Sequence, residues 1–233
     1  MDAAAVWGSR PAVVFGDRRW THAEFAEEVD RVAKGLMAIG VEAGDKVALW
    51  MTNRPEWLFA MYAIPAVGAI TVPLNTRYRA DDVAYTVDQS DTSTLLFNDR
   101  SGPVDYSAMV REVRDRWPKV ERLVVLGDDR PEGALAWSEM VAAGDGVAGR
   151  ALAARRDAVR AEDPAIIIYT SGTTSLPKGA VHDHSVIRNV SERAQIYGVT
   201  TADVHAGYLP LFHAFGYTAV SYTHLTLSTK RIV

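Results

Sequence analysis

The sequence contains no cysteine, which excludes disulfide bonds, thiolate metal ligands and a cysteine nucleophile. It has no excess of positive charge either, because 25 lysine and arginine residues stand against 29 aspartate and glutamate residues, a formal net charge of −4. A nucleic-acid binder usually carries a basic patch and a high isoelectric point, so that class is disfavoured. The first ten residues lack a basic segment followed by an apolar core, so no secretory signal is predicted. These absences are compatible with a cytoplasmic protein.

Long hydrophobic runs are scarce too. An uncharged stretch that approaches the length of a membrane span runs from Trp57 to Leu74. It is interrupted by Pro65, Gly68 and Pro73, and its character changes midway from helix-like to strand-like. We therefore predict a buried helix that leads into a buried strand, and not a transmembrane helix.

What the sequence does contain is the composition of a folded protein. Its 233 residues are 48% hydrophobic and 23% charged, which provides enough apolar matter for a core and excludes global disorder. The length suits one large domain or two small ones. Neither a tandem repeat nor a long run of one charge divides the chain.

Helix-like and strand-like patterns alternate along the first half of the chain. Thr21 and Glu24 form a capping-box pattern that begins an amphipathic helix, and Gly40 is placed to end it. Further helices are predicted at residues 53–68, 81–88 and 104–117, and buried strands at residues 46–51, 69–73, 94–97 and 123–126. Strands separated by helices favour an α/β fold with a mostly parallel sheet flanked by helices. Residues 130–161 are predicted to form a surface connection with one or two short helices.

The stretch with the clearest chemical character follows the apolar segment Ala165 to Tyr169, which is predicted to be a strand. The next ten residues are Thr170, Ser171, Gly172, Thr173, Thr174, Ser175, Leu176, Pro177, Lys178 and Gly179. Five hydroxyl side chains, a glycine that permits a tight turn and one lysine can together bind the oxygen atoms of a polyphosphate. We therefore predict a phosphate-binding loop here.

Other interpretations of this loop are weaker. A stretch rich in serine, threonine and glycine is often only a solvated loop, but the order of the residues favours a functional one. A Walker-type loop has four residues between its first glycine and a Gly-Lys-Ser/Thr triplet. Here five residues separate Gly172 from Lys178, and Gly179 follows the lysine. No Gly-x-Gly-x-x-Gly pattern follows a strand, so a dinucleotide-binding fold is also disfavoured.

The ordered string from Tyr169 to Gly179 resembles the signature loop of the adenylate-forming superfamily, which includes acyl-CoA synthetases, luciferases and the adenylation domains of peptide synthetases. A second segment, Leu209 to Gly216, resembles the family's Pro-x-x-His segment, and His184 falls where the family often has a histidine. Upstream matches lie at residues 44–47, 53–57 and 72–75. The resemblance covers residues 12–217 and implies the N-terminal part of the family's large AMP-binding domain.

This resemblance implies a two-step reaction. A carboxylate attacks the α-phosphate of ATP, and a thiol, usually that of coenzyme A, then takes the acyl group. Thr170 to Thr174 are expected to cradle the β- and γ-phosphates, with Ser175 and Gly179 completing the ATP-binding loop. The candidate catalytic residues are Lys178, which adds positive charge, and His213, expected near the carboxylate and the acyl pocket. Thr170 is the expected contact to Mg²⁺. The expected substrate is a fatty or other hydrophobic acid.

Each assignment has a structural alternative. Lys178 could be an ordinary surface lysine, and His213, which stands near two phenylalanines, could simply be packed and hydrogen-bonded. His182 and His184 are two residues apart and would share one face of a strand. No third metal ligand is apparent beside them, so no metal site is predicted there.

The sequence departs from the family pattern in three respects. Ser175 stands where the family most often has glycine, which is the less strained residue in a left-handed backbone conformation. The family's adenine-binding and ribose-binding residues and its small C-terminal domain are not found, and Tyr197 to Thr200 is interpreted as a helix end capped by Gly198. Residues 221–233 resemble translated adapter DNA and are interpreted as a non-native tail after a partial domain at residues 1–220.

We therefore predict a truncated N-terminal fragment of an ATP-dependent acid–CoA ligase that does not complete adenylation by itself. A second sheet is expected to begin near the phosphate loop. Two alternatives remain open: a non-catalytic nucleotide- or pyrophosphate-binding protein, and a defective gene product without function. The acid is not identified by the sequence, and either coenzyme A or a carrier-protein phosphopantetheine can be the acceptor.

Overall fold

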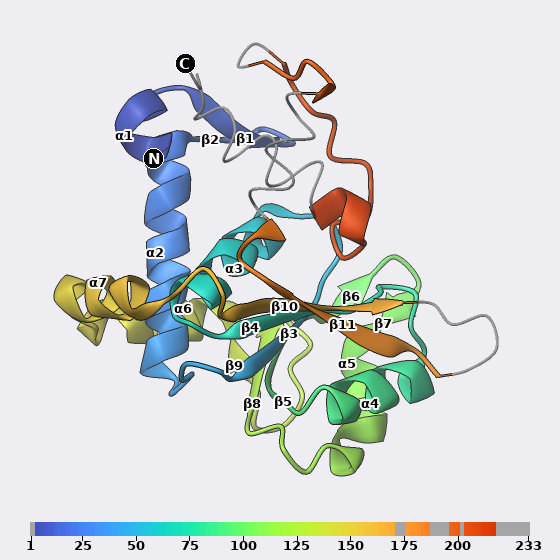
Figure 1. Cartoon of the computed structure of the whole chain (residues 1–233). Coiled ribbons are helices and arrows are strands. Elements are labelled where there is room, and N and C mark those ends of the chain that lie inside the picture. The colour runs from blue at the N-terminus through green and yellow to red at the C-terminus, as the bar shows by residue number, and fades with distance from the viewer. Residues whose placement is uncertain (1–2, 171–175, 187–195, 201–202, 218–233) are drawn as a thin grey trace.

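A computed structural model describes residues 3–170, 176–186, 196–200 and 203–217 of the chain (Figure 1). The strands are β1 (Pro11–Phe15), β2 (Arg18–Thr21), β3 (Lys46–Trp50), β4 (Ile70–Pro73), β5 (Thr92–Asn98), β6 (Arg100–Ser101), β7 (Val104–Asp105), β8 (Arg122–Leu126), β9 (Leu135–Ala136), β10 (Pro164–Thr170) and β11 (Lys178–Asp183). The helices are α1 (Ala3–Trp7), α2 (His22–Ala38), α3 (Pro55–Ala66), α4 (Ala80–Gln89), α5 (Tyr106–Val113), α6 (Trp137–Ala143) and α7 (Gly149–Ala158), with 3₁₀ helices η1 (Arg114–Arg116) and η2 (Gly144–Gly146).

One large sheet organises these elements. Its strands lie in the order β11, β10, β4, β3, β5, β8 and β9. All neighbouring strands are parallel except β10 and β11, which form an antiparallel hairpin at one side of the sheet. The predicted α/β class with a mostly parallel sheet flanked by helices is therefore confirmed.

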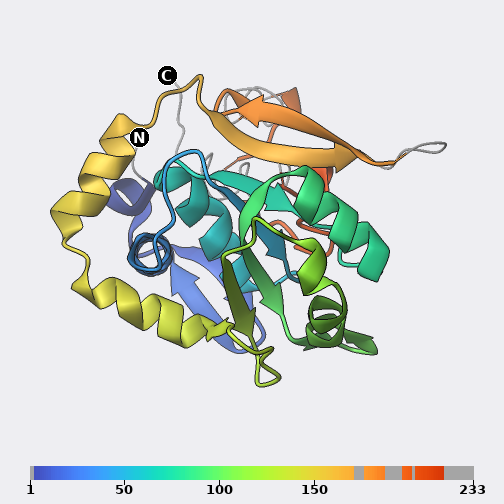
Figure 2. The same cartoon turned by 90° about the horizontal axis from the view of Figure 1, so that it is seen from below.

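The helices cover both faces of the sheet, and the side chains of β3 are buried against helices on each face. Val47 and Leu49 pack with α2 and α3 in one apolar core, whereas Ala48 and Trp50 pack with α4 and α5 in a second core. Successive side chains of a strand point to opposite faces, so a strand buried on both faces has a continuous apolar sequence. In Figure 2, α4 and α5 lie together on one side of the sheet, and α2, α6 and α7 lie on the other.

Helix α2 begins at the predicted capping box. Glu24 N donates to Thr21 Oγ1 at 3.2 Å, and Thr21 N donates to Glu24 Oε2 at 2.8 Å. The bond from Thr21 N, followed by a second bond that Thr21 Oγ1 donates to Glu24 Oε2 at 3.0 Å, holds the pKa of Glu24 below its usual value. Gly40 follows the helix with a φ of +87°, the left-handed conformation that glycine adopts without strain. Both predicted ends of the helix are therefore confirmed.

The uncharged stretch from Trp57 to Leu74 forms the buried helix and buried strand that were predicted. Trp57, Ile64 and Val72 are completely shielded from solvent. The helix ends at Ala66, and Gly68 turns the chain into β4 with a φ of +78°. Among the described residues, no helix combines the length and apolar character that crossing a membrane requires.

The prediction for residues 130–161 is only partly correct. The two short helices are present as α6 and α7, but Met140 of α6 is fully buried and Leu152 of α7 nearly so. Helix α6 lies so close to α2 that a Cβ atom on Gly35 would stand 2.7 Å from Met140 O. One on Gly144 would stand 2.6 Å from Gly35 N. The small residues that suggested a loose connection instead permit a close approach of two helices.

The expectation of a second sheet near the phosphate loop is wrong within the described residues. β11 returns along β10 and becomes the edge strand of the same sheet. The physical reason is the short connection between the two strands, which joins antiparallel neighbours directly. The other side of β11 is left unpaired in the part of the chain that the structure describes.

Candidate phosphate-binding site

Six parallel strands, β10, β4, β3, β5, β8 and β9, end at the same edge of the sheet, which we call the carboxyl edge. The chain order reverses between β3 and β5, because β4 lies on one side of β3 and β5 on the other. In open α/β sheets, ligands bind outside the carboxyl ends of the strands, near such a reversal. The fold therefore places the candidate site at the carboxyl edge.

The strand before the predicted phosphate loop, β10, ends at this edge, and the strand after it, β11, begins there. Thr170 is the last residue of β10, Lys178 is the first residue of β11, and the two are paired across the hairpin. Both residues are exposed. The strand before the loop is confirmed. The loop residues Ser171, Gly172, Thr173, Thr174 and Ser175 lie outside the described residues, so their phosphate contacts stay predictions.

Thr170 and Lys178 form the described base of the loop. Thr170 Oγ1 donates to Lys178 O at 3.4 Å, which leaves the lone pairs of the hydroxyl oxygen available to a cation. The Lys178 ammonium group forms no ion pair with any described residue. An exposed, unneutralised ammonium group beside a hydroxyl-rich loop is suited to bind an anion.

Gly179 has a packing role that the sequence did not reveal. It lies opposite Tyr169 in the hairpin. A Cβ atom at position 179 would stand 2.7 Å from Ile167 Cγ2 and 3.2 Å from Tyr169 Cζ. Glycine at this position therefore lets the Tyr169 ring lie against β11. Its predicted contact with a nucleotide stays a prediction.

His213 lies on a second segment, at residues 203–217, between the buried side chains of Leu211 and Tyr217. Its own side chain is exposed, and Nδ1 accepts a hydrogen bond from Phe215 N at 3.3 Å. A neutral imidazole that accepts at Nδ1 carries its proton on Nε2 and can donate it to an anionic oxygen. Gly216 is required by the turn, because a Cβ atom there would stand 2.1 Å from Pro210 O.

Asn53, at the carboxyl end of β3, holds this segment in place. Its Nδ2 atom donates to Gly207 O at 2.8 Å and to Leu209 O at 2.7 Å. Its Oδ1 atom accepts from Leu211 N at 3.0 Å. The segment that carries His213 is therefore attached to the carboxyl edge, next to the start of α3 (Figure 1). From the sequence, Asn53 is the start of a helix within a segment that resembles the family, and no local signal shows its distant partners.

The structure describes only part of the predicted constellation. No hydrogen bond or ion pair joins His213 to Thr170 or Lys178 within the described residues. His182 lies on β11, but the strand ends at Asp183, so His184 lies in the following turn and the two histidines do not share one strand. Burial lowers the pKa of His184, against the opposing effect of Asp163 and Asp183.

The predicted helix from Ser185 to Gly198 lies largely outside the described residues. Gly198 itself has a φ of +66°, a value that suits its predicted role as a cap. Residues 221–233, the predicted non-native tail, lie outside the described residues entirely.

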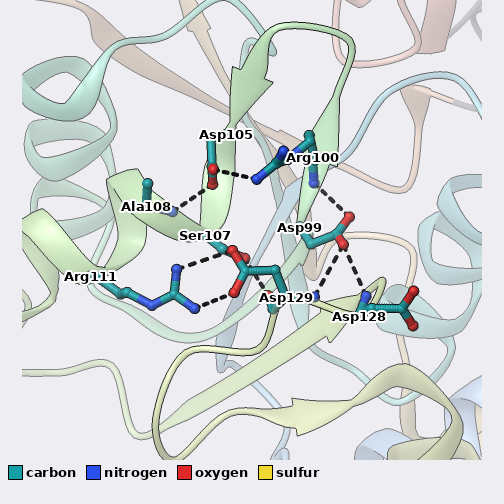
Figure 3. A network of polar contacts seen from close by, with 8 residues as sticks. All are labelled: Asp99, Arg100, Asp105, Ser107, Ala108, Arg111, Asp128 and Asp129. Carbon is teal, nitrogen blue, oxygen red and sulfur yellow. Dashed lines mark hydrogen bonds and ion pairs between the residues drawn. The ribbon is translucent and has the colours of Figure 1, made fainter.

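A network of aspartate and arginine side chains also lies at the carboxyl edge, where its hydrogen bonds join the end of β5 to the end of β8 (Figure 3). Asp99 Oδ2 accepts from Asp128 N at 2.9 Å and from Asp129 N at 3.3 Å. The ion pairs of the network join Arg100 to Asp105 and Arg111 to Asp129. Gly127 is required here, because a Cβ atom on it would stand 2.0 Å from Asp99 Cγ. These bonds give the network a structural role.

We expect Asp99→Asn to lower the free energy of unfolding by about 1–2 kcal/mol, because an amide nitrogen facing backbone N–H groups cannot accept their hydrogen bonds. Urea unfolding measures this change. The control is Asp115→Asn, since exposed Asp115 forms no side-chain hydrogen bond or ion pair with the described residues. Equal unfolding free energies for the two variants would contradict the structural role of Asp99.

Comparison with known proteins finds one matching family and several similar CoA ligases. A family model described as "AMP-binding enzyme" matches residues 1–232. The 3-[(3aS,4S,7aS)-7a-methyl-1,5-dioxo-octahydro-1H-inden-4-yl]propanoyl:CoA ligase of Mycobacterium tuberculosis is 34% identical over 215 residues, covering 89% of this chain and 40% of that protein. The crotonobetaine/carnitine–CoA ligase of Salmonella enteritidis is 30% identical over 221 residues, covering 91% of this chain and 41% of that protein. The chain thus spans about two fifths of the length of these relatives.

A solved structure has the same fold over nearly the whole chain. The inhibitor-bound N-terminal domain of FACL13 from Mycobacterium tuberculosis superposes with a TM-score of 0.72 and 27% sequence identity. The match covers 96% of this chain and 53% of that one. The chain therefore matches about half of a longer chain with the same fold.

Proposed function

The chain belongs to the AMP-binding enzyme family, and on that premise we propose that it is the phosphate-binding part of an ATP-dependent ligase that joins a carboxylic acid to coenzyme A. The observation that carries this proposal is the β10–β11 hairpin. It holds Thr170 and Lys178 on either side of a hydroxyl-rich loop, at the carboxyl edge of a parallel sheet. This is the edge where α/β sheets bind ligands.

The proposed reaction explains why such a site is needed. A carboxylate is a poor acyl donor, and transfer to AMP provides a good leaving group. The protein must hold two anions, ATP and the acid, close together and neutralise the charge that develops as pyrophosphate leaves. In this proposal, the Lys178 ammonium group stabilises the negative charge on the phosphates, and residues 170–175 hold the phosphates through hydroxyl and backbone N–H groups.

The described residues also fit a Mg²⁺ ion bound together with ATP. Mg²⁺ is usually held by substrate phosphates, water and one or two protein oxygen atoms. The Thr170 hydroxyl donates to Lys178 O and keeps its lone pairs, so it is the proposed protein ligand. The ion would supply additional positive charge at the phosphates when bound.

His213 is the proposed residue for the acid substrate. Its Nδ1 atom accepts from Phe215 N, so Nε2 is the atom that can donate to a carboxylate oxygen. We propose a fatty or other hydrophobic acid as the substrate class and coenzyme A as the acyl acceptor. Support comes from the curated relatives, whose names describe CoA ligases that act on different acids.

The first test is the affinity of the 233-residue chain for polyphosphate. Isothermal titration with inorganic tripolyphosphate and with MgATP measures it. We expect Lys178→Ala to weaken binding of both ligands about tenfold, since a hydrogen bond to a charged group contributes about 1.5 kcal/mol or more. The difference between wild type and variant should shrink at high salt, because ions screen an exposed charge.

The matched control is Lys119→Ala, which removes the same charge from the opposite edge of the sheet. Lys119 is exposed and pairs with Asp91 at 2.5 Å, just before β5. This variant should bind tripolyphosphate as wild type does. Equal affinities of Lys178→Ala and wild type would contradict the role of Lys178. Failure of the folded wild-type chain to bind either ligand would contradict the phosphate site itself.

A further inference from the structure

We propose that helix α4 positions the phosphate-binding loop, and that Tyr85 and Gln89 are the positioning residues. This inference rests on the proposed function of the loop. It goes beyond that function because α4 lies outside every motif that predicts the site. The helix is also distant from the loop in the sequence, since its contacts with the loop's flanking residues span 80 and 92 positions.

The two contacts fall at the two ends of the loop. Tyr169, the residue before Thr170, donates through its hydroxyl group to Gln89 Oε1. Tyr85 Oη donates to the carbonyl oxygen of Pro177, the residue before Lys178, at 3.2 Å. The chain therefore leaves β10 and enters β11 under the restraint of one helix, with Tyr85 and Gln89 one helical turn apart.

The helix is itself firmly held. Val83, Ala84 and Val87 are almost completely buried in the second core. Trp117 Nε1 donates to Ala84 O at 3.2 Å, and Arg116 pairs with Asp81 at 2.7 Å. A helix fixed on its buried face can serve as a reference point for Tyr169 and Pro177, the two residues flanking the loop that it contacts.

Tyr169 links the loop to this support. Its ring is half-buried and packs against the second core, beside Gly179. A tyrosine hydroxyl keeps its proton at neutral pH and can donate to Gln89, and burial raises the pKa of Tyr169 further, to about 12. Glycine at position 179 provides the space that the ring occupies.

This arrangement has a thermodynamic consequence for binding. A loop that must become ordered when it binds a ligand loses conformational entropy, and this loss weakens binding. Restraining both ends in advance reduces the loss. Removing one restraint should therefore weaken phosphate binding even though neither Tyr85 nor Gln89 is required to touch the ligand.

The test is Tyr85→Phe, which removes the hydrogen bond to Pro177 O and keeps the ring. We expect its dissociation constant for inorganic tripolyphosphate, measured by isothermal titration, to rise about three- to tenfold. Gln89→Ala should have an effect of similar size. The matched control is Tyr106→Phe, because Tyr106 Oη also donates to a backbone carbonyl, Thr76 O, at 3.1 Å. This control loses an equivalent bond away from the loop and should keep wild-type affinity.

The outcomes separate this inference from the proposed function. Wild-type affinity in folded Tyr85→Phe and Gln89→Ala would overturn the positioning role, as would an equal loss in Tyr106→Phe. If the wild-type chain binds no tripolyphosphate, the proposed function fails, and hydrogen exchange at the amides of Leu176 and Lys178 then decides the inference. Faster exchange in Tyr85→Phe than in Tyr106→Phe would support positioning by α4, and equal exchange would overturn it.

Discussion

Replacing Asn53 with alanine is expected to release the His213 segment from the carboxyl edge and to lower the free energy of unfolding by about 2–3 kcal/mol. The variant loses the three hydrogen bonds that join Asn53 to Gly207, Leu209 and Leu211. A hydrogen bond contributes about 0.5–1.5 kcal/mol net, and partly buried groups that lose their partner cost more. The sum of these contributions gives the expected decrease.

Hydrogen exchange can show whether Asn53→Ala loosens the His213 segment more than the rest of the chain. The amide of Leu211 donates directly to Asn53, so its exchange should accelerate more than that of the sheet amides. Asn53→Asp should preserve this acceptor and lose both donors, so its effect on the Leu211 amide should be smaller than that of Asn53→Ala. Urea unfolding measures the global change.

The control is Asn75→Ala, because Asn75 also lies just beyond a strand of the carboxyl edge. Its Oδ1 atom accepts only from the nearby Arg77 N, at 2.9 Å, among the described residues. This variant should leave exchange at residues 207–217 unchanged. Unaltered protection of Leu211 in Asn53→Ala would show that other contacts, such as burial of Leu211 and Tyr217, hold the segment.

Gly35→Val is expected to destabilise the chain by about 2–3 kcal/mol, because α2 and α6 touch at this position. Even a single Cβ atom on Gly35 would stand 2.7 Å from Met140 O and 3.3 Å from Val141 Cα. Both are backbone atoms, which move less readily than the end of a side chain. Overpacking of this kind typically costs about 1–3 kcal/mol, and it outweighs the small gain in helix propensity.

Gly146→Val is the matched control for this change. Gly146 follows α6 closely in the sequence, at the end of η2, but no atom beyond its two chain neighbours stands within 4 Å of the position that its Cβ would take. Thermal and urea unfolding should therefore show little change for Gly146→Val and a clear loss for Gly35→Val. Wild-type stability of Gly35→Val would contradict the close packing of α6 on α2.

The regular elements were largely predictable because their signals are local. The capping box of Thr21 and Glu24 specifies a helix start through atoms three residues apart. The run from Lys46 to Met51 indicates a strand that is buried on both faces. The same approach was only partly correct for residues 130–161, where alanine and glycine are equally typical of a loose connection and of helices that pack closely. Only the position of α2 distinguishes these possibilities.

The candidate site, too, was predictable only in part. The order of residues from Tyr169 to Gly179 predicts a strand, a loop and a lysine, and the described part of the hairpin agrees with it. The two residues that hold parts of the site in place, Asn53 and Tyr85, were not predictable from the sequence. Asn53 acts on a segment more than 150 positions away, and Tyr85 on a residue 92 positions away. Nothing near either residue in the sequence indicates its partner.

By itself, the sequence determined the fold class, the alternation of strands and helices, and the chemical character of the loop, because each depends on residues within a few positions of one another. Only the tertiary structure decided that β11 joins the main sheet, that α6 packs on α2 and that α4 contacts the residues on both sides of the phosphate loop. These features depend on which distant segments meet. That choice depends on the packing of the whole chain, which no local pattern encodes.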